Sequence, residues 1–123
     1  MRLGLGTAAL GRPLYINLRK KSDGKTDLEI FKKQSFTVLE NAYKLGVRYF
    51  DTAPGYGLAE ELVIEWLHTK KDNSIEVATK WGYTYVANFD ANATVHEIKE
   101  HSLEKLNEQY NFSKKLFPFL KVY

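Results

Sequence analysis

The sequence alternates short β-rich segments with longer amphipathic segments, and this order constrains the fold more than any other feature. Apolar, β-branched or aromatic runs occur at residues 3–7, 47–50, 75–79 and 119–123. Segments with apolar residues at helical spacing lie between these runs, at residues 27–45, 58–68 and 94–109. Strands that alternate with helices form parallel sheets with helical crossovers. The chain is therefore predicted to be an α/β domain with about four parallel strands and three helices.

Two of the helices carry end signals. The first is followed by Gly46, a residue suited to the positive φ that often ends a helix. The third opens with the letters TVHE, which fit a capping box, so it is expected to begin at Thr94. Loops are expected at residues 12–25 and 81–93. The side chains expected to face inward are Leu28, Phe31, Val38, Leu39, Ala42 and Leu45, then Leu62, Val63, Trp66 and Leu67, then Val95, Ile98, Ser102 and Leu106.

Two folds are compatible with this order: an open doubly wound sheet and a (β/α)₈ TIM barrel. A barrel takes about 250 residues, so these 123 residues would form its N-terminal half. The letters GLGTAA at residues 4–9 also fit the dinucleotide fingerprint of a Rossmann fold. That fingerprint needs a strand before it and a helix opening within it. Only three residues precede Gly4, and Gly11 and Pro13 interrupt a helix, so the Rossmann interpretation is a minor alternative.

Composition removes several classes of function. The net charge of +3 is too small to imply a nucleic-acid partner. No apolar run approaches the roughly 20 residues of a membrane span, so no membrane partner is expected. The absence of cysteine excludes disulfides and fits a reducing compartment, and a cytoplasmic location is expected. No metal site is predicted.

Polar side chains follow two of the predicted strands. Asp51 and Lys80 each stand at the C-terminal end of a strand, and Tyr56 lies in the loop after Asp51. Sites in parallel α/β folds are built at that edge of the sheet, so the three side chains can converge. A nearby ammonium favours a phenolate, which would make Tyr56 a usable proton donor to a carbonyl oxygen. The accompanying hydride requires a nicotinamide or a flavin.

Each of these residues also has a plain structural interpretation. Asp51 can belong to an Asx-type turn, Tyr56 can be a half-buried packing residue, and Lys80 can be a solvated charge. Spacing alone leaves the choice open.

A family resemblance adds to the spacing. Residues 46–57, GVRYFDTAPGYG, with Ala59 and Glu60 resemble the signature of the aldo-keto reductases. Residues 3–11 resemble the opening strand of that family, and residues 77–80, VATK, resemble its third strand. The resemblance runs in order from about residue 2 to Tyr123. It implies a TIM barrel, NADP(H)-dependent reduction of a small aldehyde or ketone, and a tetrad of Asp, Tyr, Lys and His.

The resemblance assigns roles to individual residues. Asp51, Tyr56 and Lys80 match three members of the tetrad, with Tyr56 as the general acid. Gly6, Thr7 and Asp51 would lie near the nicotinamide, and Trp81 would line the substrate pocket unless it is a core residue. The fourth member, a histidine, is expected just beyond Tyr123. The histidines of this chain do not replace it, because all are expected on the surface away from the site: His68, His96 and His101.

Residues 1–123 are therefore expected to be a partial reductase domain, truncated near the end of its fourth strand and inactive or nearly so alone. One alternative is a non-catalytic remnant, or a half-barrel that associates with itself through the exposed edges of its first and fourth strands. Another is a reductase whose reading frame is interrupted by a frameshift or a premature stop.

Overall fold

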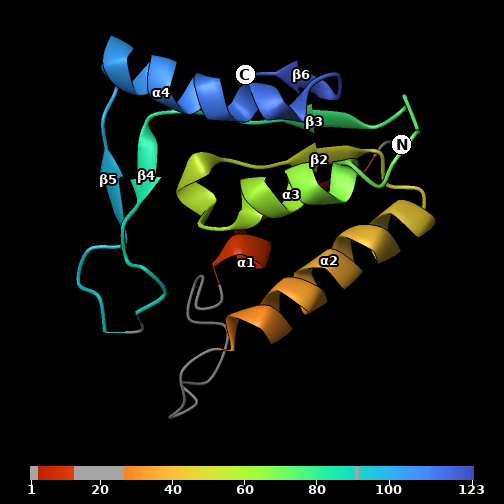
Figure 1. Cartoon of the computed structure of the whole chain (residues 1–123), viewed down its shortest axis with the longest axis horizontal. Helices are drawn as coiled ribbons and strands as arrows, with labels where there is room; N and C mark the ends of the chain where they lie inside the picture. Colours follow the sequence, from red (N-terminus) through yellow and green to blue (C-terminus); the bar gives the residue numbers. More distant parts are fainter. Residues whose placement is uncertain (1–2, 13–26, 91) are drawn as a thin grey trace.

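The computed structural model describes residues 3–12, 27–90 and 92–123 (Figure 1). Most of the loop expected at residues 12–25 lies outside the described residues. Four strands form one parallel sheet in the order β1-β2-β3-β6, and three long helices lie between successive strands. The strands are β1 (Gly4–Gly6), β2 (Tyr49–Asp51), β3 (Glu76–Ala78) and β6 (Leu120–Val122). The predicted strands and their parallel pairing are confirmed.

The strand order identifies the kind of α/β fold. Consecutive strands of the sheet are neighbours in space, whereas a doubly wound sheet reverses its order at a switch point. The helix that follows β1 directly, α1 (Ala8–Gly11), has only four residues and cannot serve as the long helix of a Rossmann unit. The sheet therefore matches part of a (β/α)₈ barrel.

The two ends of helix α2 (Leu28–Lys44) follow from its flanking residues. Asp27 Oδ1 accepts hydrogen bonds from the backbone N–H groups of Glu29 and Ile30, at 3.0 and 3.2 Å. At the other end Gly46 has a φ of 94°, which permits the chain to turn into β2. Figure 1 shows α2 beside α3 (Ala59–Leu67), while α4 (Leu103–Ser113) lies next to β6.

The main core fills the space between the helices and one face of the sheet. Phe50 of β2 and Val77 of β3 share a row of the sheet and are fully buried. Trp66 of α3 packs on Phe50 with ring centroids 4.9 Å apart. The inward residues predicted for α3 are all buried: Leu62, Val63, Trp66 and Leu67.

The prediction for α2 is only partly right. Its buried residues are Phe31, Ser35 and Leu39, which recur every four residues and form a narrow stripe. Val38 lies beside this stripe and is exposed, and Leu45 comes after the last helical turn and is 86% exposed. The Ser35 hydroxyl donates to the carbonyl of Leu10 at 2.9 Å, which explains a polar residue within the stripe.

The third crossover differs from its prediction. Residues 81–93 are not all loop, because β4 (Tyr83–Tyr85) pairs antiparallel with β5 (Glu97–Lys99). The expected capping box at Thr94 is wrong, since Glu97 lies in β5. Helix α4 begins at Leu103, where the Ser102 hydroxyl accepts from the backbone N–H of Lys105 at 3.1 Å. Val95 and Ile98, expected inside, are exposed. Pairing with β4 overrides the local helical signal.

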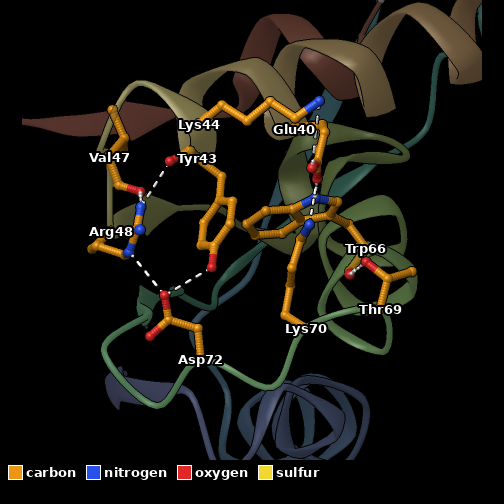
Figure 2. Close-up of polar contacts among 9 residues, drawn as sticks. All are labelled: Glu40, Tyr43, Lys44, Val47, Arg48, Trp66, Thr69, Lys70 and Asp72. Atoms are coloured by element: carbon orange, nitrogen blue, oxygen red, sulfur yellow. Dashed lines mark hydrogen bonds and ion pairs between the residues drawn. The ribbon is translucent and has the colours of Figure 1, made fainter.

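A polar cluster joins α2, α3 and the chain before β3 (Figure 2). Glu40 accepts from the Trp66 indole at 3.0 Å and forms an ion pair with Lys70. Asp72 accepts from the Tyr43 hydroxyl at 2.9 Å and pairs with Arg48 at 3.0 Å. Arg48 directly precedes β2, and Lys70 and Asp72 lie between α3 and β3. The cluster therefore ties the helices to the chain at the N-terminal ends of these two strands.

Candidate active site

The three side chains expected to converge meet at the C-terminal edge of the sheet. Asp51 is the last residue of β2, and Lys80 follows the end of β3 by two residues. Lys80 Nζ lies 2.6 Å from Asp51 Oδ1 and donates to the Thr52 carbonyl at 3.1 Å. It also lies 5.0 Å from the ring centroid of Tyr56. An acid, an amine and a phenol thus form one contiguous group.

Local backbone geometry presents Tyr56 to this group. Tyr56 ends a short 3₁₀ helix, η2 (Pro54–Tyr56), that starts with proline as helical first turns often do. Gly57 has a φ of 64°, and a Cβ there would lie 2.4 Å from the Gly11 carbonyl oxygen. This close approach of the loop to α1 requires glycine at position 57, and it holds the backbone directly after Tyr56 in place.

The electrostatics of the group are dominated by Lys80. Partial burial by itself lowers the pKa of the Lys80 ammonium, but the hydrogen bond and charge of Asp51 outweigh it. Together with a smaller contribution from Tyr56 they raise the pKa of Lys80 above its ordinary value. The lysine is therefore charged at neutral pH, with its charge held between the carboxylate and the phenol ring.

A cavity of about 420 Å³ opens beside Lys80. Its volume falls in the range of small-molecule sites, about 300–1,000 Å³. Trp81 lies in its wall. Asp51 is not part of this wall, but it contacts Lys80, which is. The residues that line the cavity are Arg12, Ala53, Pro54, Gly55, Tyr56, Lys80, Trp81, Tyr83 and Glu97.

Three residues of this wall lie outside the signature at residues 46–57 and the segment at residues 77–81, and they were not predicted. Tyr83 and Glu97 come from the hairpin β4–β5, which was expected to be loop and helix. Arg12 reaches across to Glu97, with 3.1 Å between its NH1 atom and Oε2, and it also stacks over the Tyr85 ring. The alternating aromatic residues at 83–85 were the available signal for a strand, but its partner strand was obscured by the apparent capping box.

His101 lies closer to the site than expected. It precedes α4 instead of lying within a helix, and its ring centroid is 5.0 Å from that of Trp81 and 5.8 Å from that of Tyr83. Gly82 allows this contact, since a Cβ there would lie 2.3 Å from His101 Nε2. The expectation that all three histidines are exposed is correct, but His101 supports two residues of the cavity wall.

Gly6 and Thr7 flank Asp51 in different ways. The Thr7 side chain is fully buried, and both its hydroxyl and its backbone N–H donate to the Asp51 carbonyl at 2.9 Å. Gly6 pairs with Asp51 in the sheet register and is exposed, and a Cβ at this glycine would meet no atom of the described residues within 4 Å. The space over Gly6, in the strand next to Asp51, is therefore open.

Within the described ranges, no helix has both the length and the apolar composition needed to cross a membrane. Across the same residues, no three His, Asp or Glu side chains are grouped closely enough to hold a metal ion.

Comparison with known proteins agrees with the family resemblance of residues 46–57 and 77–80. The sequence model of the Aldo/keto reductase family matches residues 2–111. D-threo-aldose 1-dehydrogenase of a Pseudomonas species is 43% identical over 51 residues, which are 40% of this chain and 16% of that protein. Norsolorinic acid reductase B of Aspergillus parasiticus is 36% identical over 67 residues, which are 52% of this chain and 18% of that protein.

Solved structures support the same fold. A Pseudomonas aeruginosa protein assigned to the aldo-keto reductases superposes with a TM-score of 0.62 at 22% identity. The superposition covers 97% of this chain and 40% of that one. The chain therefore corresponds to well under half the length of this relative, and its sheet corresponds to part of the barrel.

Proposed function

The chain belongs to the aldo/keto reductase family, and on that premise we propose that it carries the proton-transfer part of an NADPH-dependent carbonyl reductase site. The observation that carries the proposal is the contact of Lys80 with both Asp51 and Tyr56. The family and its reductase relatives support an oxidoreductase, and the cavity beside Lys80 is large enough for a small aldehyde or ketone.

The three residues have separate tasks in the proposed reaction. Tyr56 donates its phenolic proton to the carbonyl oxygen of the substrate, which becomes an alcohol. The Lys80 ammonium stabilises the phenolate that remains, because opposite charges within a few ångströms favour the ionised form. Asp51 keeps Lys80 charged and directed toward Tyr56. Trp81 would bound the substrate on the wall of the cavity.

A reduced nicotinamide supplies the hydride when bound, since no side chain can do so. The residues present fit the nicotinamide end of that cofactor. Gly6 leaves open space beside Asp51, where a planar ring can approach the backbone. Thr7 would act through the Asp51 main chain, because its own hydroxyl is buried and already donates to the Asp51 carbonyl. The preference for NADPH over NADH rests on the family resemblance.

We also propose that residues 1–123 alone are inactive or nearly so, with slow turnover at most. They supply three members of the family's tetrad, and the chain corresponds to 40% of the length of the solved relative. The expected histidine at the end of the fourth strand is not among the first 123 residues. The lack of cysteine fits the cytoplasmic location that we propose for the protein.

A sensitive assay tests the chemistry. The purified chain is incubated with NADPH carrying deuterium at the transferable position and a panel of small aldehydes, and the alcohol is analysed by mass spectrometry. We expect slow incorporation of deuterium that disappears in Tyr56→Phe and Lys80→Met. Tyr110→Phe, a change on the exposed side of α4, is the matched control and should keep the signal. Incorporation that survives Tyr56→Phe would exclude this phenol as the acid. Turnover within the usual range of about 1–1,000 s⁻¹ would contradict the proposed slow rate.

Self-association is a second candidate property, favoured by the sheet edges. In the part of the chain that the structure describes, β1 and β6 each pair with a strand on one side only. Unpaired edges are templates for pairing with another chain. We expect light scattering after size-exclusion chromatography to show a defined oligomer. A monodisperse monomer at high concentration would contradict this candidate.

A further inference from the structure

Glu60 is a buried carboxylate close to the proposed site, and the reaction does not use it. It is the second residue of α3 and is 2% exposed. Its Oε1 atom accepts from the Thr79 hydroxyl at 2.6 Å and from the Ser113 hydroxyl at 2.8 Å. One carboxylate oxygen therefore joins α3, the residue after β3 and the last residue of α4.

Thr79 is held from two sides. Its side chain donates to Glu60, and its backbone N–H donates to the carbonyl of Val122 at 3.0 Å. Thr79 is buried, while the next side chain, Lys80, is 46% exposed. Successive side chains on extended backbone point to opposite faces. Fixing the Thr79 side chain toward the helices therefore directs Lys80 toward the face that carries Asp51.

We propose that Glu60 is a positioning residue that holds Thr79, and thereby aims Lys80 at Asp51 and Tyr56. The role rests on the proposed function of Lys80. Glu60 acts as a hydrogen-bond acceptor, and the substrate and cofactor do not touch it. The two hydroxyl groups that it accepts from belong to residues 34 positions apart in the sequence, so the carboxylate ties the segment just before Lys80 to the end of α4.

Stability alone does not account for this carboxylate. Its Oε2 atom is buried and has no hydrogen-bond partner among the described residues. Burial raises the pKa of Glu60, and the two hydroxyl bonds and the charge of Lys80 offset this only in part. A buried, incompletely paired carboxylate is weak evidence for a stabilising role, because an apolar side chain avoids the desolvation cost. Its geometric effect on Lys80 gives the acceptor a specific use.

The test reads Lys80 directly and needs neither cofactor nor substrate. In protein with ¹⁵N-labelled lysine, the Lys80 ammonium should give a signal protected from exchange, because it donates hydrogen bonds to the Asp51 carboxylate and to the Thr52 carbonyl. Its assignment comes from loss of the signal in Lys80→Arg. Glu60→Leu removes the acceptor and should abolish the protection. Glu60→Gln keeps an oxygen acceptor of the same shape and should retain it, as should Glu61→Gln on the exposed side of α3.

Two results would overturn the proposal. One is a folded Glu60→Leu protein in which Lys80 exchanges as slowly as in wild type. The other is Glu60→Gln losing protection as fully as Glu60→Leu, which would mean that charge matters and the acceptor does not. Thr79→Val is the second variant if Glu60→Leu does not fold, and it should likewise lose the protected signal. If Lys80 behaves as expected while no deuterium is transferred, the proposed function fails and the positioning role stands.

Discussion

Replacing Gly82 with alanine is expected to destabilise the protein and to disturb the wall of the cavity. Gly82 has a φ of 97°, a conformation that costs an L-residue about 1–2 kcal/mol. The new Cβ would also lie 2.3 Å from His101 Nε2. The exposed imidazole can rotate away, but it would then lose its edge-on contacts with Trp81 and Tyr83. Each aromatic contact of this kind is worth about 0.5–1.5 kcal/mol, so adding the strain and the two lost contacts gives an expected total loss of about 2–5 kcal/mol.

A double-mutant cycle with His101→Ala separates the two costs. Without the imidazole, Gly82→Ala should cost only the backbone strain, about 1–2 kcal/mol. Urea unfolding followed by circular dichroism measures each free energy. Acrylamide quenching reports the cavity wall, because Trp66 is fully buried and Trp81 is only partly buried. Quenching should increase in Gly82→Ala and in His101→Ala.

Two outcomes would refute this reasoning. An equal cost of Gly82→Ala with and without His101 would show that Cβ and the imidazole do not conflict. A cost below about 0.5 kcal/mol, the usual range of a neutral surface change, would show that the backbone is not strained at this position.

Three further predictions concern the sheet edge and its charges. Gly6→Ala should leave stability within about 0.5 kcal/mol, since its Cβ meets no atom of the described residues. It should weaken NADPH binding in calorimetry, and unchanged binding would count against the space over Gly6 as the nicotinamide site. Asp51→Asn should lower the pKa of Lys80 in an NMR titration, because the Asp51 interactions help raise it. Because the pKa of Lys80 is raised in the folded state, Lys80 stabilises the fold below its unfolded pKa of about 10.4, and this stability is lost as pH rises through its folded pKa. Wild type should therefore lose more stability than Asp51→Asn when urea unfolding is repeated at alkaline pH. Hydrogen bonds from Ser74 and then Tyr43 lower the pKa of Asp72 to about 2. The stability that the Asp72 carboxylate contributes is therefore present above its unfolded pKa of about 3.9 and is lost as pH falls toward its folded pKa. Asp72→Asn should destabilise the protein at pH 7 and have little effect near the folded pKa, and an equal effect at both pH values would contradict this.

The proposed site combines groups from segments that are far apart in the chain. Asp51 and Tyr56 come from the signature after β2, while Lys80 follows β3. Arg12 and the hairpin β4–β5 supply the facing wall of the cavity. Arg12 and the hairpin residues of the wall can therefore be changed by mutation without replacing a residue proposed for proton transfer.

The hairpin shows where local reasoning fails. Residues 94–97 fit a capping box, and nothing within that short window argues against a helix. The competing structure is a pairing between residues 83–85 and 97–99, whose strands are separated by eleven residues. That pairing depends on contacts between segments distant in sequence, such as the ion pair of Arg12 with Glu97. No local sequence pattern therefore reveals it. His101, Tyr83 and Glu97 were missed for this one reason.

The sequence alone determined the alternation of strands and helices, and therefore the parallel sheet and the edge at which Asp51, Tyr56 and Lys80 meet. These features depend on short-range periodicity and on the rule that strand ends share one edge. The tertiary structure decided which surfaces surround them: the hairpin wall, the His101 support and the Glu60 link behind Lys80. Each of these requires contacts between segments distant in sequence, whose geometry exists only once the chain has packed.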